Sequence, residues 1–268
     1  MATSNYASKT ANTQGFIHYT ETEHQTWQQL YQRQLTALKQ SACDEFQIGV
    51  KALALSPTHI PQLTDINTKL QALTAWQVAP VPALISFKAF FELLANQLFP
   101  CATFIRTPEE LDYLKEPDIF HEVFGHCTLL THPGFAQFTQ AIGQVGSSLS
   151  KEDRPILARL YWFTVEFGLI QTTQGLRIYG GGILSSIDET NYALHSDIPV
   201  REPFDLIRVL RTPYRYDEKQ RSYFIIDNFE SLFQLTCKKT LLEAFQTAKS
   251  LGPLPNRHNK PEKESWTC

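Results

Sequence analysis

Features that direct a chain into a membrane or out of the cell are missing from these 268 residues. Nowhere do about 18 apolar residues follow one another, the length at which a stretch becomes a candidate membrane-spanning helix. The polar stretch 1–15 also lacks the apolar segment that a secretory signal requires. We therefore expect a cytoplasmic protein with no membrane partner.

Neither charge of one sign nor cysteine is concentrated in the sequence. Lys and Arg number 24 against 27 Asp and Glu, a formal net charge of −3, so no overall positive field favours nucleic acid. The five cysteines are odd in number and form no C-x-x-C pair, which indicates reduced thiols instead of a disulfide framework. A small-molecule ligand is the partner class that remains.

What the chain does contain is typical of a globular enzyme. Its apolar fraction is 43%, with 18 Phe, 10 Tyr and 4 Trp, and its 19% of charged residues is too low for a disordered chain. No internal repeat or low-complexity linker divides it. The sequence therefore predicts one mainly α catalytic domain over 16–252 with a few short β-strands, between a disordered N-terminal tail (1–15) and a polar C-terminal tail (253–268).

Apolar spacing and breaker residues locate the expected elements. Short β-branched or Pro-punctuated stretches suggest strands at 101–106 and between 191 and 226, and glycines suggest a loop at 179–182. Helical periodicity or long apolar runs predict helices over the following ranges: 27–38, 65–73, 87–98, 118–130, 154–171 and 229–248.

The helix expected after Pro117 carries His121, Glu122 and His126 in the run H-E-V-F-G-H. The run is one residue longer than the zinc-protease motif H-E-x-x-H, and positions i and i+5 of an α-helix lie about 140° apart. An ordinary zinc-peptidase site is therefore disfavoured. The two histidines can still reach one metal if the first sits at the helix entry or the helix is locally distorted. The alternative is an ordinary pair of surface or core histidines.

One acid, Glu166, stands alone in the apolar run Tyr161–Leu169. Burying an unpaired carboxylate is unfavourable by several kcal/mol, so Glu166 needs a metal, a network of hydrogen-bond donors or a cation such as Arg159 or Arg177. Two imidazoles and one carboxylate form the facial triad that leaves positions on Fe(II) open for O₂ chemistry. His121, His126 and Glu166 match that set.

Three blocks in this order carry a family resemblance: Pro117–His126, Tyr161–Leu169 and Tyr179–Ser186. Together with 60–65 and 135–138 they resemble the pterin-dependent aromatic amino acid hydroxylases, most of all the bacterial members that act on phenylalanine. The resemblance spans roughly 27–189. It implies a monooxygenase that converts L-phenylalanine to L-tyrosine, with Fe(II), a tetrahydropterin (tetrahydrobiopterin or a bacterial equivalent) and O₂ as co-substrate.

The resemblance also implies roles for single residues around the iron and the pterin. His121, His126 and Glu166 correspond to the iron ligands. Phe90 corresponds to the phenylalanine that stacks on the pterin, and Glu122 to a hydrogen-bonding partner of the pterin. From the residues alone, Phe90 is equally well explained as core packing.

Further residues correspond to the family's substrate site. Arg106 matches the arginine that pairs with the substrate carboxylate, a contact for which the guanidinium fork is suited; a surface arginine is the alternative. Residues expected to hold or line the amino acid are Trp162, Gly182 and Ser185.

Three more residues are expected to support the iron ligands. Asp118 corresponds to a residue that orients a histidine ligand, and Tyr161 and Phe167 are expected to pack beside the iron.

Animal members have Thr-Pro where this chain has Leu114-Lys115, so one substrate contact cannot be transferred. No regulatory domain or tetramerising tail is evident, so we expect a monomer or homodimer.

Three alternatives stay open at this point. Hydroxylation of tryptophan or tyrosine would use the same metal and pterin residues. A zinc peptidase would use Glu122 as its base, and a binding module would keep the ligands without turnover. The segment 201–221 interleaves basic and aromatic residues as nucleic-acid binders do, but acidic residues dilute the pattern, so we expect no nucleic-acid partner.

Overall fold

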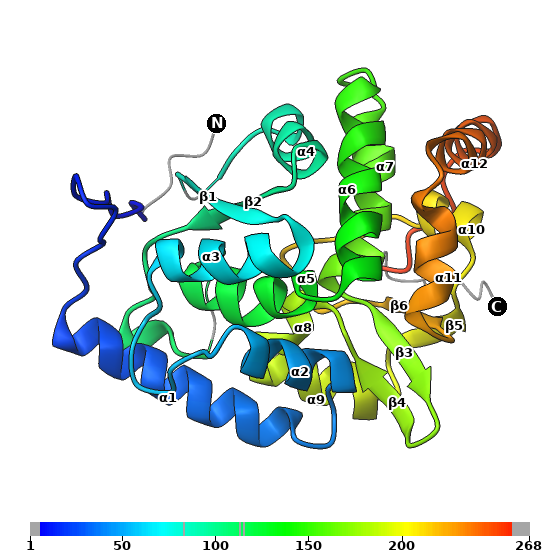
Figure 1. Ribbon diagram of the computed structural model, residues 1–268. Coiled ribbons are helices and arrows are strands. Elements are labelled where there is room, and N and C mark those ends of the chain that lie inside the picture. Colours follow the sequence, from blue (N-terminus) through cyan, green and yellow to red (C-terminus); the bar gives the residue numbers. More distant parts are fainter. Residues whose placement is uncertain (1–5, 83, 113, 115, 259–268) are drawn as a thin grey trace, which may run out of the picture.

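The computed structural model describes residues 6–258 apart from 83, 113 and 115. Helices dominate the architecture (Figure 1). Two π-helical segments, Phe120–Cys127 and Trp162–Glu166, interrupt the α-helical pattern, and short 3-10 turns cover Pro108–Glu110 and Gln234–Thr236. The α-helices are α1 (Glu21–Leu38), α2 (Asp44–Ala52), α3 (Leu63–Thr74), α4 (Phe87–Ala95), α5 (Thr128–Leu130), α6 (Pro133–Ser148), α7 (Arg154–Tyr161), α8 (Gly181–Leu184), α9 (Ile187–His195), α10 (Leu206–Arg211), α11 (Phe229–Phe233) and α12 (Lys238–Leu251).

The strands form two small sheets. One is a parallel pair, and the other has the order β4-β3-β6-β5, in which only β3 and β4 are antiparallel. This architecture confirms the expectation of a mainly α domain with a few short strands. The strands are β1 (Gln77–Val81), β2 (Leu98–Ala102), β3 (Leu169–Thr172), β4 (Gly175–Ile178), β5 (Val200–Pro203) and β6 (Ser222–Ile226).

Helix α1 shows how the sequence pattern becomes structure. Its N-terminus is closed by a capping box in which Thr20 accepts from the backbone of Glu23 and the Glu23 side chain accepts from the Thr20 backbone. Trp27 is fully buried, and its indole N–H donates to the Ser56 carbonyl over 2.9 Å. The predicted apolar face of this helix is confirmed.

Two predicted helix ends are wrong. The helix expected over 87–98 ends at Ala95 because Gln97 adopts a positive φ of 58°, which an α-helix cannot continue. The helix expected over 154–171 ends at Glu166, and the next residues form β3. A continuous apolar run does not distinguish a buried helix from a buried strand, which explains the second error.

Three other expectations also need correction. Residues 179–182 are not simply a loop, since Gly181 begins α8, a helix too short to show an apolar period. The last helix is broken between α11 and α12, where Cys237 is extended with ψ 111°. The helical spacing of Ile66, Leu70 and Leu73 in the sequence predicts that they share one face of α3, but Leu73 is 47% exposed.

Both expected tails include residues that contact the domain. The Ser8 hydroxyl donates to the Val81 carbonyl over 2.6 Å, and the Leu254 N–H donates to the Arg211 carbonyl over 2.8 Å. Residues 1–5 and 259–268 of the expected tails lie outside the described residues. None of the described helices is long and apolar enough to cross a membrane.

Candidate metal centre and ligand cavity

The π-helical segment Phe120–Cys127 resolves the spacing of its two histidines. Its hydrogen bonds close at i→i+5, so the first and last residues of H-E-V-F-G-H come back to the same side of the helix. The Nε2 atoms of His121 and His126 lie 3.1 Å apart, although five residues separate them in sequence. The structure therefore has the locally distorted helix that the motif requires for a shared metal.

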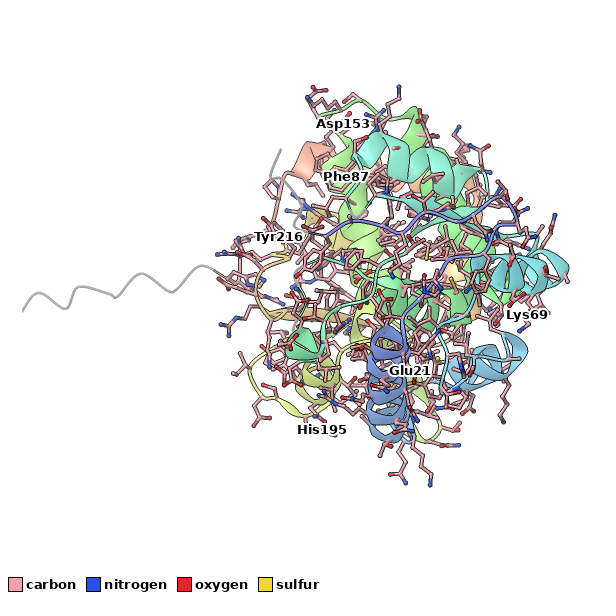
Figure 2. All side chains as sticks on the ribbon, turned by 90° about the vertical axis from the view of Figure 1, so that its left-hand side faces the viewer. Glu21, Lys69, Phe87, Asp153, His195 and Tyr216 are labelled. Atoms are coloured by element: carbon pink, nitrogen blue, oxygen red, sulfur yellow. The ribbon has the colours of Figure 1, made fainter. Side chains whose placement is uncertain are left out.

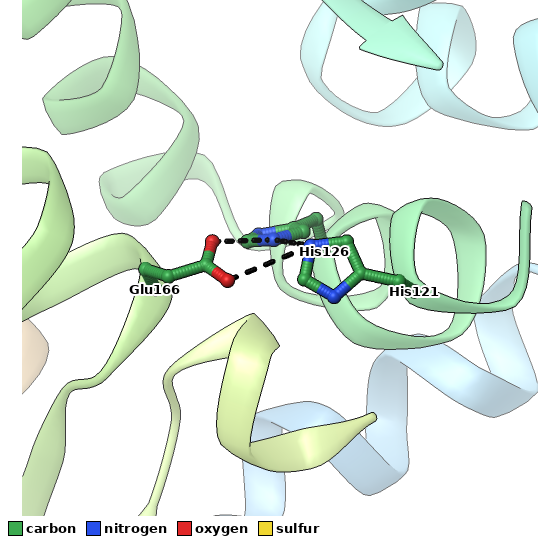
Figure 3. Close-up of side chains that lie close together, drawn as sticks. All are labelled: His121, His126 and Glu166. Carbon is green, nitrogen blue, oxygen red and sulfur yellow. Dashed lines mark hydrogen bonds and ion pairs between the residues drawn. The ribbon is translucent and has the colours of Figure 1, made fainter. Parts of the chain in front are cut away.

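The second π-helical segment supplies the carboxylate. Glu166, its last residue, places Oε2 at 2.9 Å from His126 Nε2 and Oε1 at 3.5 Å from His121 Nε2 (Figure 3). The two arginines considered as partners for Glu166 are elsewhere: Arg159 donates to the Leu210 carbonyl and Arg177 to the Leu176 carbonyl.

The three side chains fit a metal ion sterically. Two donors bound at about 2.0–2.2 Å and at right angles to each other are separated by about 3 Å. The observed separations of 2.9, 3.1 and 3.5 Å are close to that value. Among the described residues, His121, His126 and Glu166 are the group identified as able to hold an ion. A set of two imidazoles and one carboxylate would leave positions on such an ion open for reactants.

The protonation of His121 also suits a metal ligand. The Ser185 hydroxyl donates to the Gly181 carbonyl over 2.9 Å, so its oxygen accepts the Nδ1–H of His121 at 2.9 Å. This hydrogen bond fixes the tautomer that leaves the Nε2 lone pair free. Burial lowers the pKa of His121 to about 4, so the ring is neutral at pH 7.

Glu166 is held as an anion. Burial alone raises the pKa of its carboxyl group, but the adjacent imidazoles of His126 and His121 outweigh that effect and leave the pKa below its ordinary value. A carboxylate and two imidazoles are the ligand set of non-haem Fe(II) oxygenases.

Two glycines provide the space that these ligands occupy. A Cβ at Gly181 would lie 2.3 Å from Nδ1 of His126, and a Cβ at Gly182 would lie 2.4 Å from Oε1 of Glu166. No side chain larger than hydrogen fits at either position without moving a ligand. The Y-G-G-G run at the start of α8 thus has a steric function beside the metal site.

The three ligands lie in the wall of a cavity of about 650 Å³. Nearly all the residues that the sequence analysis selects line this one cavity, although they come from distant segments of the chain. The exception is Asp118, which is fully buried behind Arg106. The selected lining residues are Phe90, Arg106, His121, Glu122, His126, Tyr161, Trp162, Glu166, Phe167, Gly182 and Ser185.

Glu122 faces the cavity beside the first histidine and is 7% exposed. Burial, and then the nearby Glu166 and Asp118, raise the pKa of Glu122 well above its ordinary value. A protonated carboxyl can donate one hydrogen bond and accept others. That suits a heterocycle that presents both N–H and C=O groups.

Arg106 and Asp118 form a buried bidentate pair. Asp118 accepts from Nε of Arg106 at 2.9 Å and from Nη2 at 3.1 Å, and it also accepts the backbone N–H of His121 at 3.0 Å. Asp118 therefore contacts the backbone of His121, whereas Ser185 contacts its ring. Arg106 is 8% exposed, so it is not a surface arginine.

The outer part of the cavity contains residues that the sequence analysis did not select. Tyr214 stacks on Trp162 with ring centroids 4.3 Å apart, and Gln220 accepts the indole N–H of Trp162 over 2.9 Å. Tyr216 is 77% exposed at the surface (Figure 2). Leu114 also lines the cavity, whereas its neighbour Lys115 lies outside the described residues. No feature of the sequence indicated that this region would meet Trp162.

The basic and aromatic pattern of 201–221 also has a different structural basis. Arg208 pairs with Glu202, Arg215 with Asp217, and Lys219 with Asp188. Glu202 and Asp217, which dilute the pattern in the sequence, and Asp188 from α9 thus pair with three of its cations.

Comparison with known proteins extends these observations. A family model described as biopterin-dependent aromatic amino acid hydroxylase matches residues 1–246. The chain belongs to this family. The phenylalanine-4-hydroxylase of Pseudomonas aeruginosa is 55% identical over 252 residues, which cover 94% of this chain and 95% of that protein.

Solved structures of the family share the fold. The cold-active phenylalanine hydroxylase from Colwellia psychrerythraea 34H superposes with a TM-score of 0.91 at 47% identity, covering 94% of this chain and 97% of that one. The phenylalanine hydroxylase of Chromobacterium violaceum with bound oxidised Fe(III) has a TM-score of 0.85 at 44% identity, covering 91% and 89%. Iron is thus bound in a structurally similar member of the family.

Proposed function

We propose that the protein is a phenylalanine 4-monooxygenase that converts L-phenylalanine to L-tyrosine with O₂ and a tetrahydropterin at a mononuclear Fe(II) site. The observation that carries the proposal is the convergence of His121, His126 and Glu166 in the wall of a cavity of about 650 Å³. The 55% identical relative is named for this reaction.

The overall reaction balances as follows. One oxygen atom of O₂ enters the C4–H bond of the phenylalanine ring, and the other goes to the pterin, which supplies two electrons. Iron and pterin together supply the activation of O₂. His121, His126 and Glu166, which line the cavity, would hold the iron.

Phe90 and Glu122 are proposed to bind the pterin. Phe90 lines the cavity from α4, and its ring packs edge-on against Tyr161 with centroids 4.8 Å apart, which fixes its plane. A flat heterocycle can stack on a ring held in this way. Glu122, whose pKa is raised by burial, would hydrogen-bond the heterocycle beside the metal.

The amino acid is proposed to bind between Arg106 and the aromatic wall. Two of the N–H groups of Arg106 are engaged by Asp118, so the guanidinium is oriented and its remaining N–H groups can pair with a carboxylate. Trp162 and Phe167, whose centroids lie 4.7 Å apart, would contact the substrate ring. Gly182 and Ser185, next to the metal ligands, would leave room for the amino acid backbone.

Tyr161 and Asp118 are proposed to support this arrangement. Tyr161 lies between Phe90 and His126, at ring distances of 4.8 and 6.3 Å. Asp118 holds both Arg106 and the backbone of His121, so it would link the substrate side of the cavity to the metal side.

We also propose a cytoplasmic location and a monomeric or homodimeric state. Cys43, Cys101 and Cys127 are buried free thiols, which suits a reducing compartment. Light scattering of the purified protein during gel filtration gives the oligomeric state directly.

A product assay tests the proposed function. The purified protein is supplied with Fe(II), a tetrahydropterin and air, and is given L-phenylalanine, L-tryptophan or L-tyrosine, with products separated by chromatography. We expect tyrosine from phenylalanine, dependent on both iron and pterin. Predominant 5-hydroxytryptophan would contradict the substrate, and bound iron without any hydroxylated product would contradict the activity.

A further inference from the structure

Gln220 connects two parts of the cavity wall that are distant in sequence. It lies two residues before β6, near the end of the loop between α10 and β6. We call this loop, residues 212–221, the rim loop. Its side chain is 1% exposed and carries no charge. A buried amide is unfavourable unless its polar atoms are hydrogen-bonded, so its partners are informative.

The Gln220 side chain joins Trp162, which lines the cavity, to two residues of the rim loop. Its Oε1 accepts the indole N–H of Trp162 over 2.9 Å, and its Nε2 donates to the carbonyls of Arg215 at 2.8 Å and Glu218 at 3.2 Å. An indole N–H can only donate and a carbonyl can only accept, so the orientation of the amide is determined.

The backbone of Gln220 is held as well. Its N–H donates to the carboxylate of Glu189, and the Tyr223 hydroxyl donates to the same carboxylate over 2.7 Å. Glu189 lies on α9 and also lines the cavity. The end of the rim loop is therefore fixed at both its side chain and its backbone.

The held indole determines the space beside the metal site. Trp162 stacks on Tyr214, at 4.3 Å and 16° between the ring planes, and packs at a tilt against Phe167, at 4.7 Å and 37°. The hydrogen bond at the indole N–H restricts rotation of the ring in its plane and sliding along Tyr214. The amide of Gln220 therefore holds this ring together with the two neighbouring rings, and so contributes to the width of the aromatic pocket.

We propose that Gln220 is a positioning residue that sets the selectivity of the pocket for a one-ring over a two-ring aromatic amino acid. This inference rests on the proposed function. Gln220 acts through Trp162 and the rim loop. When the amide is lost, the indole and the loop gain freedom, the pocket widens and water enters more readily.

The decisive variant is Gln220→Met, which keeps the length of the side chain and removes the donor and the acceptor. The matched control is Gln62→Met, because Gln62 makes the same kinds of hydrogen bond, with the N–H and the carbonyl of Ile17, and does not line the cavity. The second variant is Gln220→Glu, which keeps an acceptor for Trp162 and replaces the donors to the loop.

Binding of L-phenylalanine and L-tryptophan is measured by calorimetry, and kcat/KM by product assay. For Gln220→Met we expect the preference for phenylalanine to fall by roughly tenfold, mainly through KM, as for loss of one hydrogen bond in a buried site. Less tyrosine should form per pterin oxidised. Gln62→Met should keep the wild-type preference.

Nitrogen-15 spectra of the tryptophan indoles give a readout that does not need turnover. The Trp162 N–H signal, assigned with Trp162→Phe, should shift and exchange faster in Gln220→Met and stay near its wild-type position in Gln220→Glu. An unmoved signal or an unchanged preference in Gln220→Met would overturn the inference. If wild-type protein binds phenylalanine but forms no tyrosine, the proposed function fails, while binding and spectra still decide the role of Gln220.

Discussion

The inner and outer parts of the cavity are built in different ways. At the inner end, Arg106 and Asp118 form an ion pair in which the side chains are 9% and 0% exposed, respectively. The metal ligands there belong to helical segments. At the rim, the pair of Arg215 and Asp217 is 44% and 46% exposed and lies on a loop. The inner end fixes chemical groups through burial, whereas the rim adjusts the size of the pocket.

Changing Glu166 to Ala should have the largest effect. It removes one of the three proposed ligands, so tyrosine formation should be lost. Iron affinity should fall by more than about a hundredfold, because losing a group that only supports a ligand already lowers it by about 10- to 100-fold. Metal analysis after dialysis and the product assay measure both effects. Glu152→Ala, at an exposed position, is the control. An active variant with a full complement of iron would refute the ligand assignment.

Breaking the inner ion pair should strongly destabilise the fold. Asp118→Asn leaves Arg106 buried without its counter-charge, which reduces the free energy of unfolding by about 3–5 kcal/mol. Asp217→Asn at the rim should leave the free energy of unfolding unchanged within error, because its partner is exposed. Urea denaturation of both variants gives the comparison. Equal effects would show that burial does not separate the two regions.

The steric role of the glycines can be tested at Gly181. Gly181→Ala introduces a Cβ 2.3 Å from His126 Nδ1, so the ligand must move, and iron affinity should fall by roughly 10- to 100-fold, as for loss of a group that supports a ligand. In Gly134→Ala the nearest contact is 3.3 Å, to the movable ring of His132. Iron titration of the two variants should separate them, and equal affinities would exclude the steric role.

The smallest effect concerns pH. His24, outside the cavity, accepts the Ile60 N–H at 3.1 Å, and burial together with His59 lowers the pKa of His24. The unfolded chain then binds the proton more readily, so stability is full above about pH 6.5 and falls as pH drops below it. Thermal unfolding of wild type and His24→Gln between pH 7.5 and 5.5 tests this. The melting temperature of the variant should fall slightly less than that of the wild type as the pH is lowered. The same fall in both proteins would contradict this role of His24.

The metal site was the most predictable part of the molecule. The lone Glu166 in an apolar run and the paired histidines indicated the ligands, and the structure brings all three together. The π-helical geometry could not be derived, because apolar periodicity assumes 3.6 residues per turn and a π-segment leaves no separate pattern.

The rim could not be predicted for a different reason. Trp162, Tyr214 and Gln220 meet through tertiary packing, and nothing in their local sequence connects them. Helix α8 was missed because four residues are too few to show a period. Short elements and loop contacts depend on the assembled fold. The metal ligands, by contrast, stand in local runs of sequence that can be recognised before the fold is known.

The central claim is that one iron ion binds to His121, His126 and Glu166 at this cavity. Crystals of the iron-loaded protein, measured on both sides of the iron absorption edge, test it most directly. We predict a single anomalous peak bonded to Nε2 of both histidines and to the carboxylate of Glu166. A peak at any other set of side chains, or none in protein shown by metal analysis to contain iron, would contradict the account.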